Sequence, residues 1–215
     1  MQVIEALNSV AVLLGILVAF YGIDSWRMEH SGKRKMELAE DALTLFYEAA
    51  DAIGHIRHPA GFGSETESIE RGEDETDAQF EARRNASIVF IRYQAYNELF
   101  SKLHAMRYRF MAQVGREQAK PFDDLRSINI SIQGSARVLA RLWQREEFVS
   151  NDQREKHYKS IEKHEAIFWS GLEENDAIAA ELKNVIATIE GTCKGIIAGK
   201  RTLFGFINYK VWPRS

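Results

Sequence analysis

The sequence predicts an all-α protein in which an N-terminal transmembrane helix continues into an antiparallel bundle of four to five helices. Three observations lead to this class. A long uncharged run lies near the N-terminus, from Ala6 to Ile23. Residues that favour helices are plentiful, and only 3 of the 215 residues are proline. Alternating β-branched runs joined by tight Asn-Gly turns, which are typical of strands, do not occur.

The uncharged run has a length suited to a bilayer, because its 18 residues span roughly 27 Å as a helix. Tyr21 and Trp26 stand at its far end, where amphipathic rings favour the membrane interface. Two other interpretations stay open: a buried helix of a soluble core and a cleaved signal peptide. The segment before the run has no basic residue and no Ala-x-Ala site follows, which disfavours the signal peptide. We therefore predict an anchor over residues 1–26.

The charges that flank the anchor predict its orientation. Only Glu5 precedes the run, whereas a basic collar follows it, made of Arg27, Lys33, Arg34 and Lys35. The positive-inside rule places the collar in the cytoplasm and the N-terminus outside, which predicts a single-pass protein of a bacterial inner membrane. A single cysteine, Cys193, fits a reducing compartment, and its position on an apolar helix face favours a buried side chain over a nucleophile.

After the anchor, apolar residues recur at the 3-4 spacing of a helix that packs on a neighbour. This interaction seam consists of Met36, Ala39, Leu43, Phe46, Ala50 and Ile53. The seam predicts one long helix to about Arg57, which Pro59 ends. Its partner is either another helix of the same chain or a second copy.

Residues 61–75 differ in composition from the helices on either side. They contain three glycines and mostly acidic charges, which predicts a mobile acidic loop. The loop is either a solvated linker or a docking segment for a basic partner.

Four further helices follow within the predicted domain 27–198. Thr76 and Gln79 form a capping box, and Gly115 is a natural stop for the helix that the box begins. Pro121 suits the first turn of the next helix, Ser150 caps a third, and Asn175 or Asp176 caps the last. The predicted inner faces are Ile91, Ala95, Leu99, Leu103, Met106, Phe110 and Val114; Phe122, Leu125, Ile128, Ile132, Leu139 and Trp143; Tyr158, Ile161, Phe168 and Leu172; and Ile178, Leu182, Val185, Ile189 and Ile196.

The C-terminal tail, residues 199–215, interleaves basic and aromatic residues and has no acidic residue. Such a tail packs on the bundle, lies on an anionic membrane surface, or binds another ligand such as a single-stranded nucleic acid. Because the chain as a whole has a formal net charge of -3, no nucleic acid partner is expected. The residues expected at the membrane surface are Lys200, Arg201, Phe204, Phe206, Tyr209, Lys210 and Trp212.

No motif indicates catalysis, so we predict neither an enzyme nor a cofactor. Phosphate-binding loops, a nucleophile elbow, Glu-x-x-His and His-x-x-x-His are all absent from the sequence. The nearest approach to a metal site is a set of residues on one predicted helix, with further histidines elsewhere: His157, Glu162, His164 and Glu165, then His55, His58 and His104. The aromatic residues line either the core or a ligand pocket: Tyr93, Tyr96, Tyr108, Phe110, Trp143, Phe168 and Trp169.

The segment from Ile23 to Ile53, IDSWRMEHSGKRKMELAEDALTLFYEAADAI, resembles the juxtamembrane start of uncharacterised bacterial single-pass membrane proteins with a small cytoplasmic helical domain. The likeness is architectural and implies no catalytic residue. We predict a membrane-tethered interaction or scaffold subunit whose partners are the lipid bilayer and either a membrane protein or a second copy. Two alternatives are a membrane-anchored sensor or effector, for example in stress or phage defence, and a metal-dependent helical-bundle enzyme.

Overall fold

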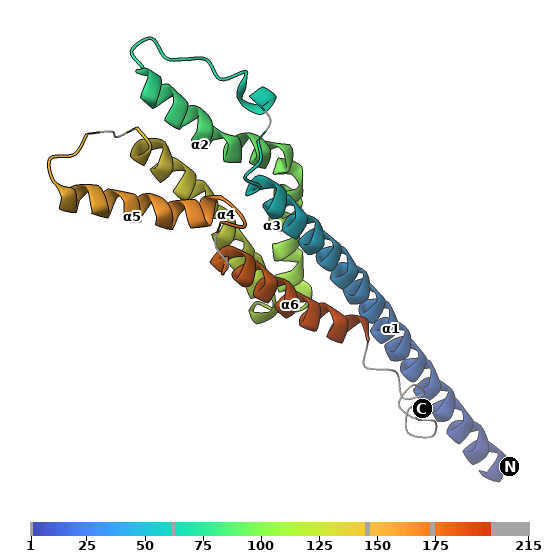
Figure 1. Cartoon of the computed structure of the whole chain (residues 1–215). Coiled ribbons are helices and arrows are strands. Elements are labelled where there is room, and N and C mark those ends of the chain that lie inside the picture. Colours follow the sequence, from blue (N-terminus) through green and yellow to red (C-terminus); the bar gives the residue numbers. More distant parts are fainter. Residues whose placement is uncertain (1, 62, 145–146, 173–174, 199–215) are drawn as a thin grey trace, which may run out of the picture. The chain divides into compact units, whose positions relative to one another are not determined.

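The computed structural model describes residues 2–61, 63–144, 147–172 and 175–198, with side chains from Val12 onward. Within these residues the chain forms six α-helices and two short 3-10 helices, and no strand. The predicted all-helical class is confirmed (Figure 1). The elements are α1 (Gln2–Ile56), η1 (Gly63–Thr66), α2 (Asp77–Ala95), α3 (Asn97–Gln113), η2 (Glu117–Ala119), α4 (Lys120–Leu142), α5 (Asn151–Phe168) and α6 (Ala177–Ile197).

The chain divides into two compact units. The first comprises Met1–Asp41 and Cys193–Ser215, and the second comprises Ala42–Thr192. Helices α1 and α6 each contribute residues to both units. The predicted division at residues 26 and 198 rests on composition, and it stays a prediction.

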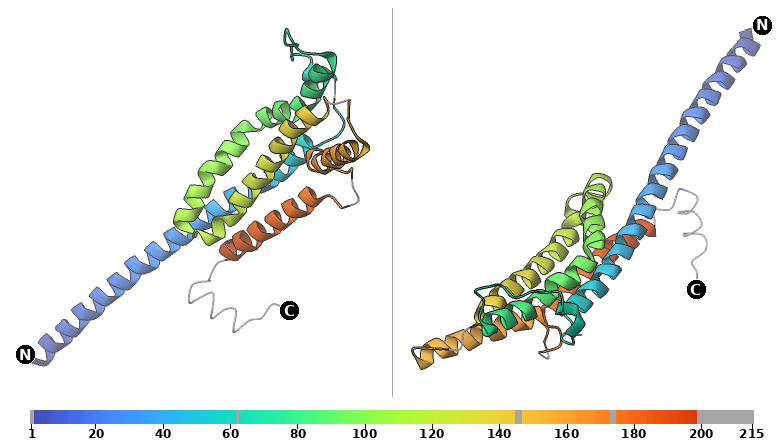
Figure 2. Two further views of the ribbon diagram at one scale, coloured as in Figure 1. Left: turned by 90° about the vertical axis from the view of Figure 1, so that its left-hand side faces the viewer. Right: turned by 90° about the horizontal axis from the view of Figure 1, so that it is seen from above.

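Helix α4 is the central element of the second unit, because it packs against both α2 and α5 (Figures 1 and 2). Its predicted inner face is buried at Phe122, Leu125, Ile128, Ile132 and Leu139. Three rings join this face to α1 and α3: the ring centroids of Phe46 and Phe122 lie 4.8 Å apart, and those of Phe110 and Phe122 lie 5.4 Å apart. This aromatic contact forms part of the core of the unit.

The seam of α1 is buried, but its centre differs from the predicted one. Ala39, Phe46 and Ile53 are fully buried, as a packed seam requires, whereas Met36, Leu43 and Ala50 are only half-buried. The fully buried row keeps the 3-4 spacing and consists of Ala39, Ala42, Phe46, Ala49, Ile53 and Ile56. Three of the six residues in this row are alanines, whose small side chains let a neighbouring helix approach closely.

The helix predicted from Thr76 to Gly115 is interrupted, and this prediction is corrected. It consists of α2 and α3, with the non-helical residue Tyr96 (φ -105°, ψ 12°) between them. No glycine or proline marks the break. The Tyr96 hydroxyl lies 3.2 Å from His55 Nδ1, and the two rings meet edge to face. A contact with α1, 41 residues earlier in the sequence, therefore accompanies the interruption.

The predicted caps are present at several helix ends. Thr76 and Gln79 form both hydrogen bonds of the capping box. Ser150 Oγ accepts a hydrogen bond from the Gln153 amide, and Asp176 accepts one from the Ala179 amide. Gly115 has a φ of +143° and donates to the Phe110 carbonyl, which ends α3.

Two buried arginines bind the carbonyl ends of helices. Arg57 is 2% exposed and donates to the carbonyls of Ala166, Ile167 and Trp169, where α5 ends. The same guanidinium binds both carboxylate oxygens of Asp176, at 2.9 and 3.0 Å. These carbonyls have no partner within their own helix, so Arg57 satisfies them and joins the ends of α1, α5 and α6.

Arg92 performs the same role for the end of α1. It is 3% exposed and donates to the carbonyls of His55, His58 and Ala60. It also binds both oxygens of Glu65, at 2.7 and 3.0 Å. Glu65 belongs to the acidic segment, so one end of that segment is fixed to a buried charge on α2.

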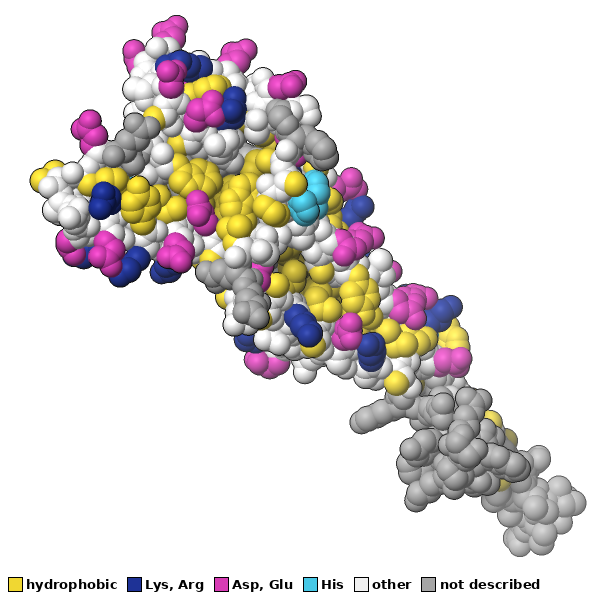
Figure 3. Space-filling model, in the orientation of Figure 1, with side chains coloured by type: hydrophobic (Ala, Val, Ile, Leu, Met, Phe, Trp, Pro, Cys, Tyr) yellow, Lys and Arg dark blue, Asp and Glu magenta, His cyan; other side chains and the backbone are white. Residues whose placement is uncertain are grey.

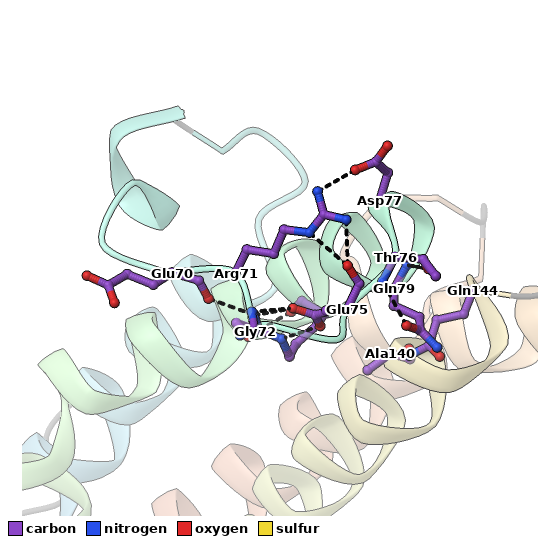
Figure 4. Close-up of polar contacts among 11 residues, drawn as sticks. Glu70, Arg71, Gly72, Glu75, Thr76, Asp77, Gln79, Ala140 and Gln144 are labelled. Atoms are coloured by element: carbon purple, nitrogen blue, oxygen red, sulfur yellow. Dashed lines mark hydrogen bonds and ion pairs between the residues drawn. The ribbon is translucent and has the colours of Figure 1, made fainter.

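The other end of the acidic segment is tied to α2 by a second ion-pair network (Figure 4). Arg83 binds both oxygens of Glu75 at 2.7 Å and also donates to the Glu70 carbonyl. Arg71 donates to the Glu75 carbonyl and to Asp77. The Arg83 guanidinium lowers the pKa of Glu75 to about 2. The mobility of residues 61–75 stays a prediction. Composition alone did not indicate that both ends of the segment form ion pairs with α2.

Candidate functional site

The N-terminal part of α1 is apolar and exposed. From Val12 to Met28, its large apolar side chains are between 48 and 76% exposed. They point in every direction around the helix, so no one-sided seam accounts for them. The side chains are Val12, Leu13, Leu14, Ile16, Leu17, Val18, Phe20, Tyr21, Ile23, Trp26 and Met28.

The structure does not contain a helix that meets the length and hydropathy of a membrane span among the residues whose side chains it describes. The transmembrane part of the predicted fold is therefore not shown. The apolar run begins at Ala6, six residues before the first described side chain.

The predicted interface residues at the end of the run are solvent-exposed. Tyr21 and Trp26 are exposed, and the Trp26 ring stacks on His30 with centroids 5.7 Å apart. The collar residues Arg27, Lys33, Arg34 and Lys35 are exposed as well. Lys33 lies 3.9 Å from Glu37, an exposed pair that contributes little to stability. The remaining predicted interface residues, Lys200, Arg201, Phe204, Phe206, Tyr209, Lys210 and Trp212, lie outside the described residues.

The second unit contains a cavity of about 460 Å³ lined by residues of α2, α3 and α4. Of the seven aromatic residues that were candidates for a pocket, only Tyr93 lines it. Phe110 and Phe168 are completely buried and belong to the core. Trp143 and Trp169 pack on Phe168, and Trp143 donates to Glu165 at 2.9 Å. Four of the seven candidates therefore take part in side-chain packing: Phe110 against Phe122, and Trp143 and Trp169 against Phe168.

The histidines are not brought together. In the described part of the chain, no three His, Cys, Asp or Glu side chains are arranged to hold a metal ion. His164 Nδ1 lies 3.1 Å from Ser135 Oγ, and burial together with Lys163 lowers the pKa of His164. His157 is 8% exposed and packs on Phe148.

Sequence reasoning missed the two buried arginines, although a signal was present. Arg92 lies three residues after Val89, and Arg57 lies four residues after Ile53, so both fall on buried helix faces. A charged residue on such a face indicates a buried partner. Cys193 is buried, as its apolar helix face suggested, and burial raises the pKa of its thiol to about 11.

Positive and negative side chains are interspersed over the face drawn in Figure 3, which shows no large area of one sign. Comparison with models of protein families, with curated proteins and with solved structures finds no match to this chain.

Proposed function

We propose that this protein is a membrane-tethered helical bundle that acts as an interaction or scaffold subunit at the inner face of a bacterial membrane. The observation that carries the proposal is the exposed apolar surface of α1 from Val12 to Ile23. A helix with apolar side chains on all sides is stable where water is excluded. The preceding residues, from Ala6, extend this run to 18 uncharged residues.

The collar supports the proposed direction of the tether. The collar begins four residues after the apolar run ends at Ile23, and its residues are all exposed: Arg27, Lys33, Arg34 and Lys35. Basic residues at this position are retained on the cytoplasmic side and attract anionic lipid headgroups. The second unit then lies in the cytoplasm, where tethering raises its effective concentration for partners on the same surface.

Membrane fractionation of the full-length chain tests the tether. We expect the wild-type chain to stay in the membrane pellet after alkaline carbonate washing. The double variant Leu14→Arg, Leu17→Arg should move to the supernatant, because each arginine at a bilayer centre costs about 2.5–3.5 kcal/mol. The matched control His30→Arg, Ser31→Arg adds the same charges to exposed positions of α1 beyond the run and should stay in the pellet. Wild-type chain in the supernatant would contradict the proposal.

The same variants test the interaction role. Affinity purification after gentle detergent extraction should recover a stoichiometric partner with the wild-type chain and the control. The Leu14→Arg, Leu17→Arg variant should lose that partner if the tether brings the two together. Recovery of the wild-type chain alone would contradict a scaffold role and leave the tether unaffected.

A second candidate function is a membrane-anchored sensor that binds a ligand within its bundle. The observation that favours it is the cavity of about 460 Å³ lined by Tyr93, α3 and α4. Cavities that bind small molecules fall in the range of about 300–1,000 Å³.

A further inference from the structure

The cavity between α3 and α4 has apolar walls and flat rings. Tyr93 and Phe100 line it, and their rings are stacked with centroids 4.8 Å apart and an angle of 4° between their planes. Phe122, Leu125 and Ile130 of α4 complete the apolar lining. Such walls bind the body of an apolar ligand. Because Tyr93 and Phe100 stack on each other, an aromatic ligand packs against the outer face or the edge of the pair.

The charged groups that line the cavity are cationic. Arg107 and Arg126 contribute guanidinium groups, and no carboxylate is among the lining residues. Arg107 is held from outside the cavity by Asp123, with two nitrogen–oxygen contacts of 2.8 and 2.9 Å. Arg126 makes no ion pair or hydrogen bond with another described residue, so its charge is available to a ligand.

Arg126 lies close enough to Tyr93 for its positive charge to act on the Tyr93 hydroxyl. Burial raises the pKa of Tyr93, while a hydrogen bond with Gln133 and the positive charge of Arg126 act in the opposite direction. Three polar groups therefore lie close to one another on the wall of the cavity, those of Tyr93, Gln133 and Arg126.

Asn129 supplies a polar group that has no partner. Its side chain lines the cavity, although the residue is only 7% exposed. Within the described residues its amide makes no hydrogen bond. Its amide atoms are accessible within the cavity, so they are free to hydrogen-bond to a polar ligand.

We infer that this cavity is a binding site for a small aromatic anion. The rings of Tyr93 and Phe100 contact its apolar body, the Arg126 guanidinium binds its carboxylate or a similar anionic group, and Asn129 hydrogen-bonds to it. The inference names the ligand class for the sensor candidate and does not depend on the tether.

Isothermal titration of the full-length chain in lipid nanodiscs tests the inference, with 2-naphthoate as the probe and empty nanodiscs as the blank. We expect saturable 1:1 binding of 2-naphthoate and at least tenfold weaker binding of the neutral 2-naphthamide. Arg126→Gln should weaken naphthoate binding at least tenfold, because a hydrogen bond to a charged group is lost. Naphthamide binding should be unchanged by this substitution.

Two further variants locate the site. Arg109→Gln removes an equivalent exposed charge from α3 outside the cavity and should leave naphthoate binding within twofold of wild type. Ser101→Trp places a large side chain at an exposed lining position and should abolish binding of both probes. Circular dichroism confirms that each variant remains folded.

Three results would overturn the inference: no saturable binding of naphthoate, equal binding of naphthoate and naphthamide, or equal effects of Arg126→Gln and Arg109→Gln. Each of these results leaves the membrane fractionation outcome unaffected, so failure of the site and failure of the tether are distinguishable.

Discussion

The Arg57 side chain joins parts of the second unit that are far apart in the sequence. Its partners lie between 109 and 119 residues away in the sequence. Burial alone would raise the pKa of Asp176, but the hydrogen bonds from Arg57 and from the Ala179 amide lower it below its ordinary value. The carboxylate therefore stays ionised in a half-buried position because Arg57 neutralises it.

Arg57→Met should destabilise the protein by about 3–5 kcal/mol, since it leaves the carboxylate and three carbonyls without their partner. Arg57→Lys should lower the free energy of unfolding by a smaller amount. Lysine keeps the positive charge but lacks the planar guanidinium that binds several oxygens at once. Arg154→Met, at an exposed position of α5, is the matched control and should stay within about 0.5 kcal/mol of wild type. Urea unfolding followed by tryptophan fluorescence measures all three. Equal stability of Arg57→Met and Arg154→Met would show that the contacts contribute nothing.

At the scale of elements, the acidic segment and α2 form one structural unit. Phe80 lies beneath both Arg83 and Arg84, yet the two arginines differ in their partners. Arg83 binds Glu75 and the Glu70 carbonyl, whereas Arg84 binds Glu81 on its own helix. Of these two arginines, only Arg83 contacts the segment.

Limited proteolysis with a protease that cuts after glutamate tests this difference, because Glu67, Glu70 and Glu73 lie in the segment. Arg83→Gln should raise the cleavage rate several-fold. In the wild-type chain the segment must break the Arg83–Glu75 ion pair before it can open to the protease, and the variant has no such pair to break. Arg84→Gln should be cleaved at the wild-type rate. If the wild-type chain is cleaved as fast as Arg83→Gln, the segment is mobile despite its contacts, as its composition predicts.

At the scale of the whole molecule, Cys193 reports on the folded state because it is the one cysteine in the sequence. Its side chain is fully buried, and burial raises the pKa of the thiol from 9.0 to about 11. A thiol whose pKa is raised on folding contributes stability below its unfolded pKa. That contribution is lost as the pH rises from about 9 to about 11.

Labelling of Cys193 with a thiol reagent at pH 8 should be at least about a hundredfold slower in the native chain than in urea. The raised pKa alone accounts for this factor, since it reduces the thiolate fraction from about a tenth to about a thousandth. Loss of accessibility slows the reaction further. Equal rates with and without urea would contradict the burial of this residue.

The sequence by itself determined the features that depend on neighbours within about four residues. The spacing of apolar residues predicted the buried face of α4 and three of the six fully buried positions of the α1 row. The caps at Thr76, Ser150 and Asp176 were recognisable from residue type. These signals are local because helical hydrogen bonds and caps join residues three or four apart.

Only the tertiary structure decided the features whose partners are distant in the sequence. The interruption at Tyr96 coincides with a contact to His55. The buried charge of Arg92 is neutralised by Glu65, which lies 27 residues earlier in the sequence. The lining of the cavity likewise combines residues of three helices. A local pattern shows which face of a helix is buried, but the identity of the group that meets that face depends on how the helices pack.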